Sequence, residues 1–204
     1  DLHRLKWLRV GAVWAMDHTL AADSTKRPIM SVRDLASSKQ LVWEVVERED
    51  AESTLRILLR AGEEYGLPLV FKSDNGSAFI AGEVEGRLSE CGVTALLSPP
   101  RTPSYNGAVE RAGGQMKERT MWEARMSDRW TSEHLKSARA GANELPRQGN
   151  AGGRSPDEAW APRKPVTSIE RASFLDRVDL ERSRALAEAK AAGKDVGSRS
   201  VNAA

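Results

Sequence analysis

The chain of 204 residues is long enough for one good-sized domain and a tail, but too short for two full domains. Hydrophobic residues make up 40% of it and charged residues 29%, and the net charge of +2 does not by itself indicate a nucleic-acid partner. No apolar run approaches the roughly 20 residues of a membrane span, and Cys91 is the only cysteine. We therefore exclude an intramolecular disulfide and expect a protein of a reducing cytoplasm without membrane contact.

The first elements in chain order are strands. An apolar run rich in strand formers extends over about residues 7–16 and ends at Asp17. After a polar loop, residues 29–32 and 41–46 predict two more strands, and Asp34 lies in the turn between them. Three strands in succession predict an antiparallel meander.

Helical and strand patterns alternate after the meander. Leucine and alanine recur at spacings of three and four over residues 50–65, which predicts a helix. Residues 67–71 indicate a buried strand that carries Asp74 at its C-terminal end. A second helix over residues 77–91 and a short strand over residues 93–97 follow.

The remaining predicted elements are helical. Prolines break regular structure before a helix that begins near Ala108 and carries Glu110. Another helix covers roughly residues 131–144, and residues 147–166 indicate an extended arm. A charged helix over about residues 169–192 leads into a tail that we expect to be disordered.

Strands followed by alternating helices and strands predict a mixed sheet with helices on both faces. Strand ends in an open sheet are the usual place for chemistry, and Asp17 and Asp74 both fall at predicted ends. With Glu110 they supply oxygen ligands of the kind that Mg²⁺ prefers. Two such ions on a phosphodiester activate the attacking oxygen and stabilise the leaving oxygen. The three carboxylates are therefore a candidate metal site.

Each carboxylate also has an ordinary structural explanation. Asp17 and Asp74 can be cap or turn residues after a strand, because Asn75-Gly76 is a common turn pair. Glu110 can be an acidic residue in a helix first turn, where the macrodipole favours it. The order and spacing of all three favour one joint site over three separate explanations.

The segments around the carboxylates follow a recognisable pattern. Residues 13–19 read VWAMDHT, residues 73–79 read SDNGSAF, residues 103–111 read PSYNGAVER, and residues 155–160 read SPDEAW. In order and spacing these segments resemble the catalytic core of the D-D-E integrases and transposases, over about residues 7–165. The S-D-N-G segment alone is weak evidence, whereas four ordered motifs are strong.

The resemblance implies a ribonuclease H-like α/β fold. In that fold a three-strand antiparallel meander and parallel strands form one mixed sheet flanked by helices. The implied division is an integrase catalytic core at residues 7–165 and a charged C-terminal helix and disordered tail at residues 166–204. Asp34 would then be a structural residue of the hairpin between the second and third strands.

The resemblance also implies an activity, that of a metal-dependent polynucleotidyl transferase from a bacterial mobile element. Asp17, Asp74 and Glu110 would bind two Mg²⁺ (or Mn²⁺) ions, with Asp17 bridging them. Water would first attack a phosphodiester at the element end, and the freed 3′-hydroxyl would then attack target DNA. The implied partners are both DNAs and further copies of the chain, as a homodimer or higher multimer.

Residues near the carboxylates are candidate DNA contacts. Lys117 lies two helical turns after Glu110, so both project from one face, and its ammonium would meet a phosphate or remain solvated. Arg111 would extend a phosphate track. Asn75 and Tyr105 would touch DNA near the metals, although turn formation and packing are alternative roles for them.

Two other functions remain open at this point. A stand-alone nuclease would hydrolyse nucleic acid at the same site without joining it. A non-catalytic DNA-binding or assembly subunit of a mobile element would keep the fold without turnover. The presence of all three carboxylates argues against the second of these.

Overall fold

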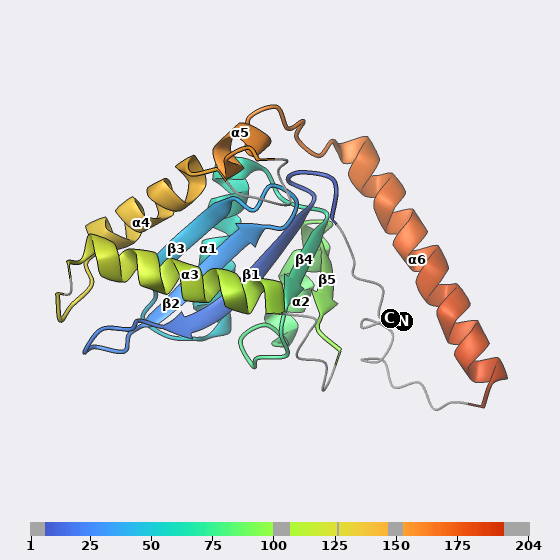
Figure 1. The fold of residues 1–204 in the computed structure, drawn as a ribbon. Coiled ribbons are helices and arrows are strands. Elements are labelled where there is room, and N and C mark those ends of the chain that lie inside the picture. The colour runs from blue at the N-terminus through green and yellow to red at the C-terminus, as the bar shows by residue number, and fades with distance from the viewer. Residues whose placement is uncertain (1–6, 100–106, 126, 147–152, 194–204) are drawn as a thin grey trace.

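The computed structural model describes residues 7–99, 107–125, 127–146 and 153–193. Three strands come first, followed by helices and strands in alternation and then by helices (Figure 1). The elements are β1 (Val13–Leu20), β2 (Pro28–Asp34), β3 (Gln40–Val45), α1 (Ala51–Tyr65), β4 (Val70–Ser73), α2 (Gly82–Glu90), β5 (Thr94–Leu97), α3 (Gly107–Glu123), α4 (Ser132–Glu144), α5 (Pro156–Trp160) and α6 (Ser168–Ala191).

The strands form one mixed sheet in the order β3-β2-β1-β4-β5. β1, β2 and β3 are an antiparallel meander, whereas β4 lies parallel to β1, and β5 parallel to β4. The central strand β1 therefore has an antiparallel partner on one side and a parallel partner on the other. The predicted α/β architecture is confirmed.

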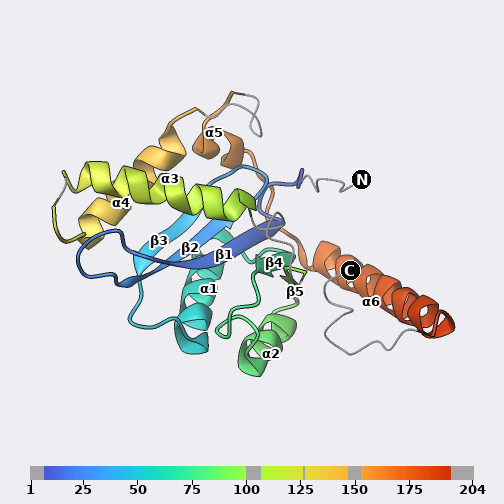
Figure 2. The ribbon, with the colours of Figure 1, turned by 60° about the horizontal axis from the view of Figure 1, so that its bottom comes forward.

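Helices cover both faces of the sheet (Figure 2). α1 and α2 lie on one face, in a buried cluster that includes Trp14, Met16, Phe71, Ile57, Leu58, Val84 and Leu88. α3 and α4 lie on the other face, in a cluster that includes Ile29, Trp43, Met116, Leu135 and Ala138. Because both faces are covered, the strands bury apolar side chains on both sides, which explains their nearly continuous apolar sequences.

Polar contacts attach α3 and α4 to β3. The indole N–H of Trp43 donates to Oγ1 of Thr120 on α3 at 2.9 Å, and both side chains are buried. On α4, the Asn143 side chain accepts from the backbone N–H of Gln40 at 2.8 Å and donates to its carbonyl at 2.9 Å. A buried donor without a partner costs about 1–3 kcal/mol, so these pairs favour one position of α3 on the sheet.

Asp34 is a structural residue, as expected. Its carboxylate is buried and accepts from the backbone N–H groups of Gly11 and Ser37, and from the hydroxyl of Ser37, at 2.6–2.8 Å. Burial raises the pKa of Asp34, and these three donors oppose that rise. The carboxylate thus closes the turn between β2 and β3.

Some boundaries differ from the sequence-based expectation. β1 continues three residues past Asp17, because β2 pairs with it as far as Leu20. The helix predicted from residue 77 begins only at Gly82, since the N–H groups of Phe79 and Ile80 both donate to the carbonyl of Gly76 in a turn.

Residues 147–166 were expected to form an extended arm, and this is wrong for part of that range. A short helix, α5, forms where Ser155 and Glu158 cap it reciprocally: the Ser155 hydroxyl accepts from the Glu158 N–H, and the Glu158 carboxylate from the Ser155 N–H. Trp160 at its end is buried against the α1 side of the core. Residues 147–152 lie outside the described residues.

α6 is attached to the domain only at its start. No residue of it is buried, but the Arg171 guanidinium donates to the carbonyls of Pro68, Leu67 and Gly92 at 2.6, 2.7 and 2.9 Å. The rest of α6 extends away from the sheet (Figure 1). The tail after residue 193, expected to be disordered, lies outside the described residues. None of the described helices is both long and apolar enough to cross a bilayer.

Candidate active site

Asp17 and Asp74 lie on neighbouring parallel strands. β1 pairs with β4 in a constant register that matches Val13 with Val70 and Ala15 with Lys72. Continued by two residues, this register puts Asp74, the first residue after β4, beside Asp17. Residues two apart in a strand project to the same face, so both carboxylates share the face of Ala15 and Lys72.

The shared face is the one that α3 covers. Asp17 pairs directly with Ser31 of β2, and Ser31 pairs with Trp43 of β3, so the three side chains project to one side of the sheet. Because Trp43 donates to Thr120 of α3, that side is the α3 side. Glu110 lies in the first turn of the same helix. Two strands, β1 and β4, and the helix α3 therefore place the three carboxylate residues on one side of the sheet.

Electrostatics also connect these residues. Burial, together with the charges of Asp74 and Glu110, raises the pKa of Asp17 from 3.8 to about 6. The Lys117 ammonium opposes this rise, which indicates that Lys117 acts on the same carboxylate. A half-buried acid surrounded by two other acids is the environment expected of a cation site before the cation binds.

The turn after β4 orients Asp74. The N–H of Gly76 donates to Oδ1 of Asp74 at 2.9 Å, and the Asn75 side-chain amide donates to the carbonyl of Ser98 at 2.8 Å. Ser98 follows β5, and its N–H and hydroxyl both donate to the carbonyl of Ser73 at 3.0 Å. Asn75 therefore forms the turn contact that was one of its two expected roles, and its role toward DNA stays a prediction.

The structure describes two of the three other candidate DNA contacts. Lys117 is partly buried on α3, and Arg111 is exposed on the same helix. Tyr105 lies outside the described residues. The glycine pair within α3 leaves the helix continuous, and a Cβ at Gly113 or Gly114 would contact no other atom within 4 Å. Neither glycine is therefore required by close packing in the described structure.

His18 lies on the opposite face of β1 from Asp17, as its strand position predicts. Its ring stacks on Phe79, with the ring centroids 4.8 Å apart and the planes at 20°. Burial lowers the pKa of His18, although the charges of Glu49, Asp74 and Asp50 oppose this. The histidine packs in the layer below the sheet, away from α3.

Lys72 was not recognised from the sequence. It is 4% exposed on β4, and burial lowers its pKa to about 8. Its position two residues before Asp74 puts it on the face of the carboxylates. A lysine directly after an apolar run that ends at Phe71, and in phase with Asp74, was the signal available in the sequence.

The charge and the oxygen atoms of the three carboxylates are suited to binding a divalent metal ion. Among the described residues, no group of three or more His, Cys, Asp or Glu side chains is close enough to hold a metal ion. The donor set is nevertheless all oxygen, which is what Mg²⁺ prefers, and metal binding would relieve the mutual repulsion that adds to burial in raising the Asp17 pKa. Asp17, Asp74 and Glu110 therefore fit a divalent cation by charge and ligand type.

Comparison with known proteins gives a consistent result. Residues 8–103 match the family described as integrase core domain. Over 125 residues, which are 61% of this chain, it is 26% identical to the Pol-related polyprotein of mouse intracisternal A-particle MIA14. The matched stretch spans only 14% of the length of that curated relative.

Solved structures resemble the fold over most of the chain. The crystal structure of the catalytic core domain of BIV integrase has 27% identity and a TM-score of 0.61, covering 74% of this chain and 94% of that one. The simian T-cell lymphotropic virus intasome, in complex with the PP2A regulatory subunit B56 gamma, has 20% identity and a TM-score of 0.71, covering 80% and 59%. The HTLV-2 integrase catalytic core with magnesium, in a trimeric form, has 20% identity and a TM-score of 0.62, covering 76% and 99%.

Proposed function

We propose that this chain, whose residues 8–103 match the integrase core domain family, is a metal-dependent polynucleotidyl transferase that cleaves DNA ends and joins them to target DNA. The observation that carries this proposal is the shared face of Asp17, Asp74 and Glu110, where mutual repulsion adds to burial in raising the Asp17 pKa to about 6. Such a site gains most from a cation when a phosphodiester is also present.

The three carboxylates are the proposed metal ligands. When bound, a pair of Mg²⁺ or Mn²⁺ ions would supply Lewis acidity on both sides of the scissile phosphodiester. The magnesium in the HTLV-2 core structure is a property of that protein and supports the choice of metal. Asp17, whose pKa the charges of both Asp74 and Glu110 help to raise, would be the ligand shared by the two ions, with Asp74 and Glu110 each completing one site.

The remaining residues would hold the DNA. Phosphoryl transfer rests on positioning and charge stabilisation, so no protein nucleophile is needed. Lys117, which acts electrostatically on Asp17, is proposed to contact a phosphate beside the scissile bond. Arg111, exposed one residue after Glu110, is proposed to extend that contact along the backbone.

The proposed reaction has two steps. Water attacks a phosphodiester at the element end, which breaks the bond to the leaving 3′-oxygen and frees a 3′-hydroxyl. That hydroxyl then attacks a phosphodiester of target DNA, and the target 3′-oxygen leaves. In the second step, the phosphorus–oxygen bond broken in the target is thus replaced by a new bond between the same phosphorus and the 3′-oxygen of the element end.

The proposed partners are the element ends, target DNA and further copies of the chain. The related structures are described as an intasome and as trimeric and dimeric core domains, which supports a multimer here. The proposed source is a mobile element, and the Pol-related relative is in keeping with one. A bacterial origin and a cytoplasmic location stay predictions from the sequence.

A strand-transfer assay tests this function. Linear donor ends and supercoiled target would be incubated with the chain and Mg²⁺ or Mn²⁺, and joined product is expected. Asp74→Asn should abolish both cleavage and joining while the fold persists. Asp179→Asn, which removes an exposed carboxylate on α6, is the matched control and should retain both. Cleavage without joined product would indicate a nuclease, and DNA binding without either would indicate an assembly subunit.

A further inference from the structure

Ser98, the first residue after β5, forms hydrogen bonds with both sequence neighbours of Asp74. Its backbone N–H and its hydroxyl each donate to the carbonyl of Ser73 at 3.0 Å. Its carbonyl accepts from the side-chain amide of Asn75 at 2.8 Å. Ser73 and Ser98 are both buried, with 4% and 6% of their surface exposed. We refer to Ser73, Asn75 and Ser98 as the Ser98 clamp, because they hold Asp74 from both sides.

Asp74 lies just beyond the part of the sheet that could hold it. The pairing of β4 with β5 ends at Ser73 opposite Leu97, and the pairing of β4 with β1 ends one residue earlier. The turn that follows contributes the Gly76 N–H, which donates to the Asp74 carboxylate. That bond orients the carboxylate within its turn, whereas the Ser98 clamp fixes the turn on the sheet.

The hydroxyl of Ser98 adds a bond that strand pairing does not require. In a parallel ladder the backbone N–H at this position can donate to the neighbouring strand whatever the side chain is. The hydroxyl supplies a second donor to the same Ser73 carbonyl, whose oxygen has two lone pairs to accept both. Alanine at position 98 would consequently keep the ladder bond and remove this second donor.

We propose that Ser98 is a positioning residue for the reaction, which acts through the clamp to keep the Asp74 carboxylate in place beside Asp17. Ser98 itself would touch neither the metal nor the DNA. Mg²⁺ demands near-ideal octahedral geometry, so a small displacement of one carboxylate weakens its binding. Residues that hold metal ligands from outside typically change metal affinity or activity by about 10–100-fold when they are replaced. Ser98 has this relation to Asp74.

A purely stabilising role at the end of β5 would need less than the structure shows. The ladder bond from the Ser98 N–H suffices to end the strand. The hydroxyl bond and the Asn75 amide bond both lead to residues that adjoin Asp74. Three bonds that converge on the two neighbours of one carboxylate favour control of that carboxylate over general stability.

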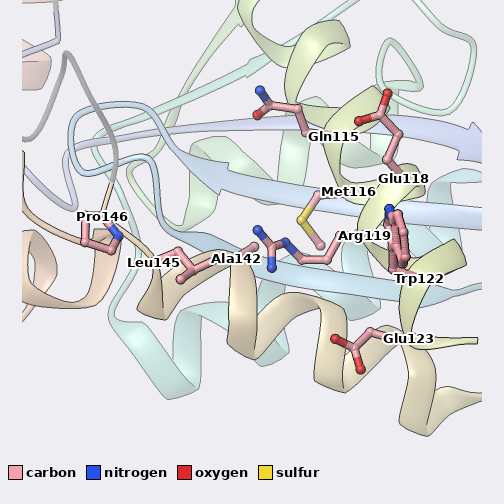
Figure 3. Close-up of a pocket in the computed structure, with 9 residues that line it drawn as sticks. All are labelled: Gln115, Met116, Glu118, Arg119, Trp122, Glu123, Ala142, Leu145 and Pro146. Carbon is pink, nitrogen blue, oxygen red and sulfur yellow. The ribbon is translucent and has the colours of Figure 1, made fainter.

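The clamp is separate from the pocket on α3. That pocket, of about 460 Å³, lies beside Trp122 between the C-terminal half of α3 and the end of α4 (Figure 3). Its lining residues belong to α3, to α4 and to the two residues after α4, so none of them is part of the clamp. Glu123, an exposed carboxylate in that lining, is therefore a suitable control position outside the clamp.

This inference deepens the proposed function and rests on it, because a positioning residue presupposes a metal at Asp74. Metal affinity is measured without DNA, so the two can fail separately. A parent chain that binds Mg²⁺ but joins no DNA would count against the proposed function, and the metal affinities of the variants would still decide the role of Ser98.

The test compares Ser98→Ala with Ser98→Thr, which retains a hydroxyl, and with Ser53→Ala, which removes another buried serine hydroxyl, on α1. Calorimetric titration without DNA should show a Mg²⁺ affinity about tenfold lower in Ser98→Ala, with a smaller loss for the larger Mn²⁺ ion. At saturating Mg²⁺, kcat for strand transfer should fall by about tenfold while KM for DNA stays the same. Ser98→Thr, Ser53→Ala and Glu123→Gln should behave like the parent in metal affinity and kcat.

Asn75→Ala provides a second measurement, because it removes the other arm of the clamp at an exposed position that should tolerate the change. It should weaken Mg²⁺ binding without DNA in the same direction, whether or not Asn75 also contacts DNA. A Ser98→Ala protein with a lower melting temperature but the Mg²⁺ affinity and kcat of the parent would overturn the proposal. So would a Ser98→Thr variant as impaired as Ser98→Ala, or an Asn75→Ala variant with unchanged affinity.

Discussion

The backbone N–H of Gly76 donates a 2.9 Å hydrogen bond to Oδ1 of Asp74, which orients this carboxylate at the end of β4. A Cβ at Gly76 would lie only 3.0 Å from the same oxygen and 3.4 Å from the ring of Phe79. The Asp74 carboxylate can therefore keep this orientation only if residue 76 has no side chain. This relationship carries the first prediction.

Gly76→Ala should displace the Asp74 carboxylate and reduce strand transfer by about tenfold or more, since a misplacement of 1 Å can cost a large rate factor. The fold should persist, and circular dichroism would check this. Gly82→Ala is the matched control, because a Cβ there contacts nothing within 4 Å. Wild-type activity in Gly76→Ala would show that the Asp74 orientation seen here is not the one used in catalysis.

The contribution of Asp17 to the stability of the metal-free protein should rise as the pH is lowered from 7 toward 4. The folded pKa of Asp17 is raised to about 6 from 3.8, so between these values the folded state binds the proton more tightly than the unfolded state. Asp17→Asn should remove this dependence and stabilise the protein at pH 7 by about 1–3 kcal/mol. Urea unfolding in EDTA across this pH range measures both, and equal slopes for parent and variant would contradict the prediction.

Metal affinity should follow the opposite trend and weaken as the pH falls. A pKa of about 6 leaves Asp17 mostly ionised at pH 7 and mostly protonated at pH 5. The proton must leave before the metal binds, so affinity should drop by about tenfold between these values. Calorimetric titration of Mg²⁺ or Mn²⁺ in buffers of different ionisation enthalpy would detect the released proton. An affinity independent of pH would remove Asp17 from the ligand set.

Lys117→Ala should weaken DNA binding across sequences without changing metal affinity. Loss of one phosphate contact lowers the slope of log K against log salt by about 0.9 on duplex DNA. Fluorescence anisotropy at several salt concentrations gives this slope. Lys136→Ala, at an exposed position paired with Glu133 on α4, should leave it unchanged. If the two variants have equal slopes, Lys117 is a solvated surface lysine.

Removal of residues 166–204 should lower the melting temperature by about 5 °C or more, because the three hydrogen bonds of Arg171 to loop carbonyls are lost. From composition alone we would expect almost no change. A shorter truncation after Val178 keeps those bonds and should preserve the melting temperature. If both truncations melt like the parent, the start of α6 contributes nothing to stability.

The sequence by itself determined the local elements and the candidate residues. Periodicity identified the meander, α1 and the strand before Asp74, because these segments are apolar enough for local pattern to agree with the final packing. The motifs around Asp17, Asp74 and Glu110 indicated the resemblance to an integrase core, since each is a short contiguous segment, and residues 8–103 match that family. The position of His18 opposite Asp17 followed from strand alternation alone.

Only the tertiary structure determined how these elements and residues interact with one another. The extension of β1 past Asp17 depends on pairing with β2, and the anchoring of α6 depends on carbonyls of loops about 80–100 residues away in sequence. The raised pKa of Asp17 depends on burial and on charges from two other elements. The pocket beside Trp122 needs α4 to pack on α3. All of these are long-range effects, which a local pattern cannot contain.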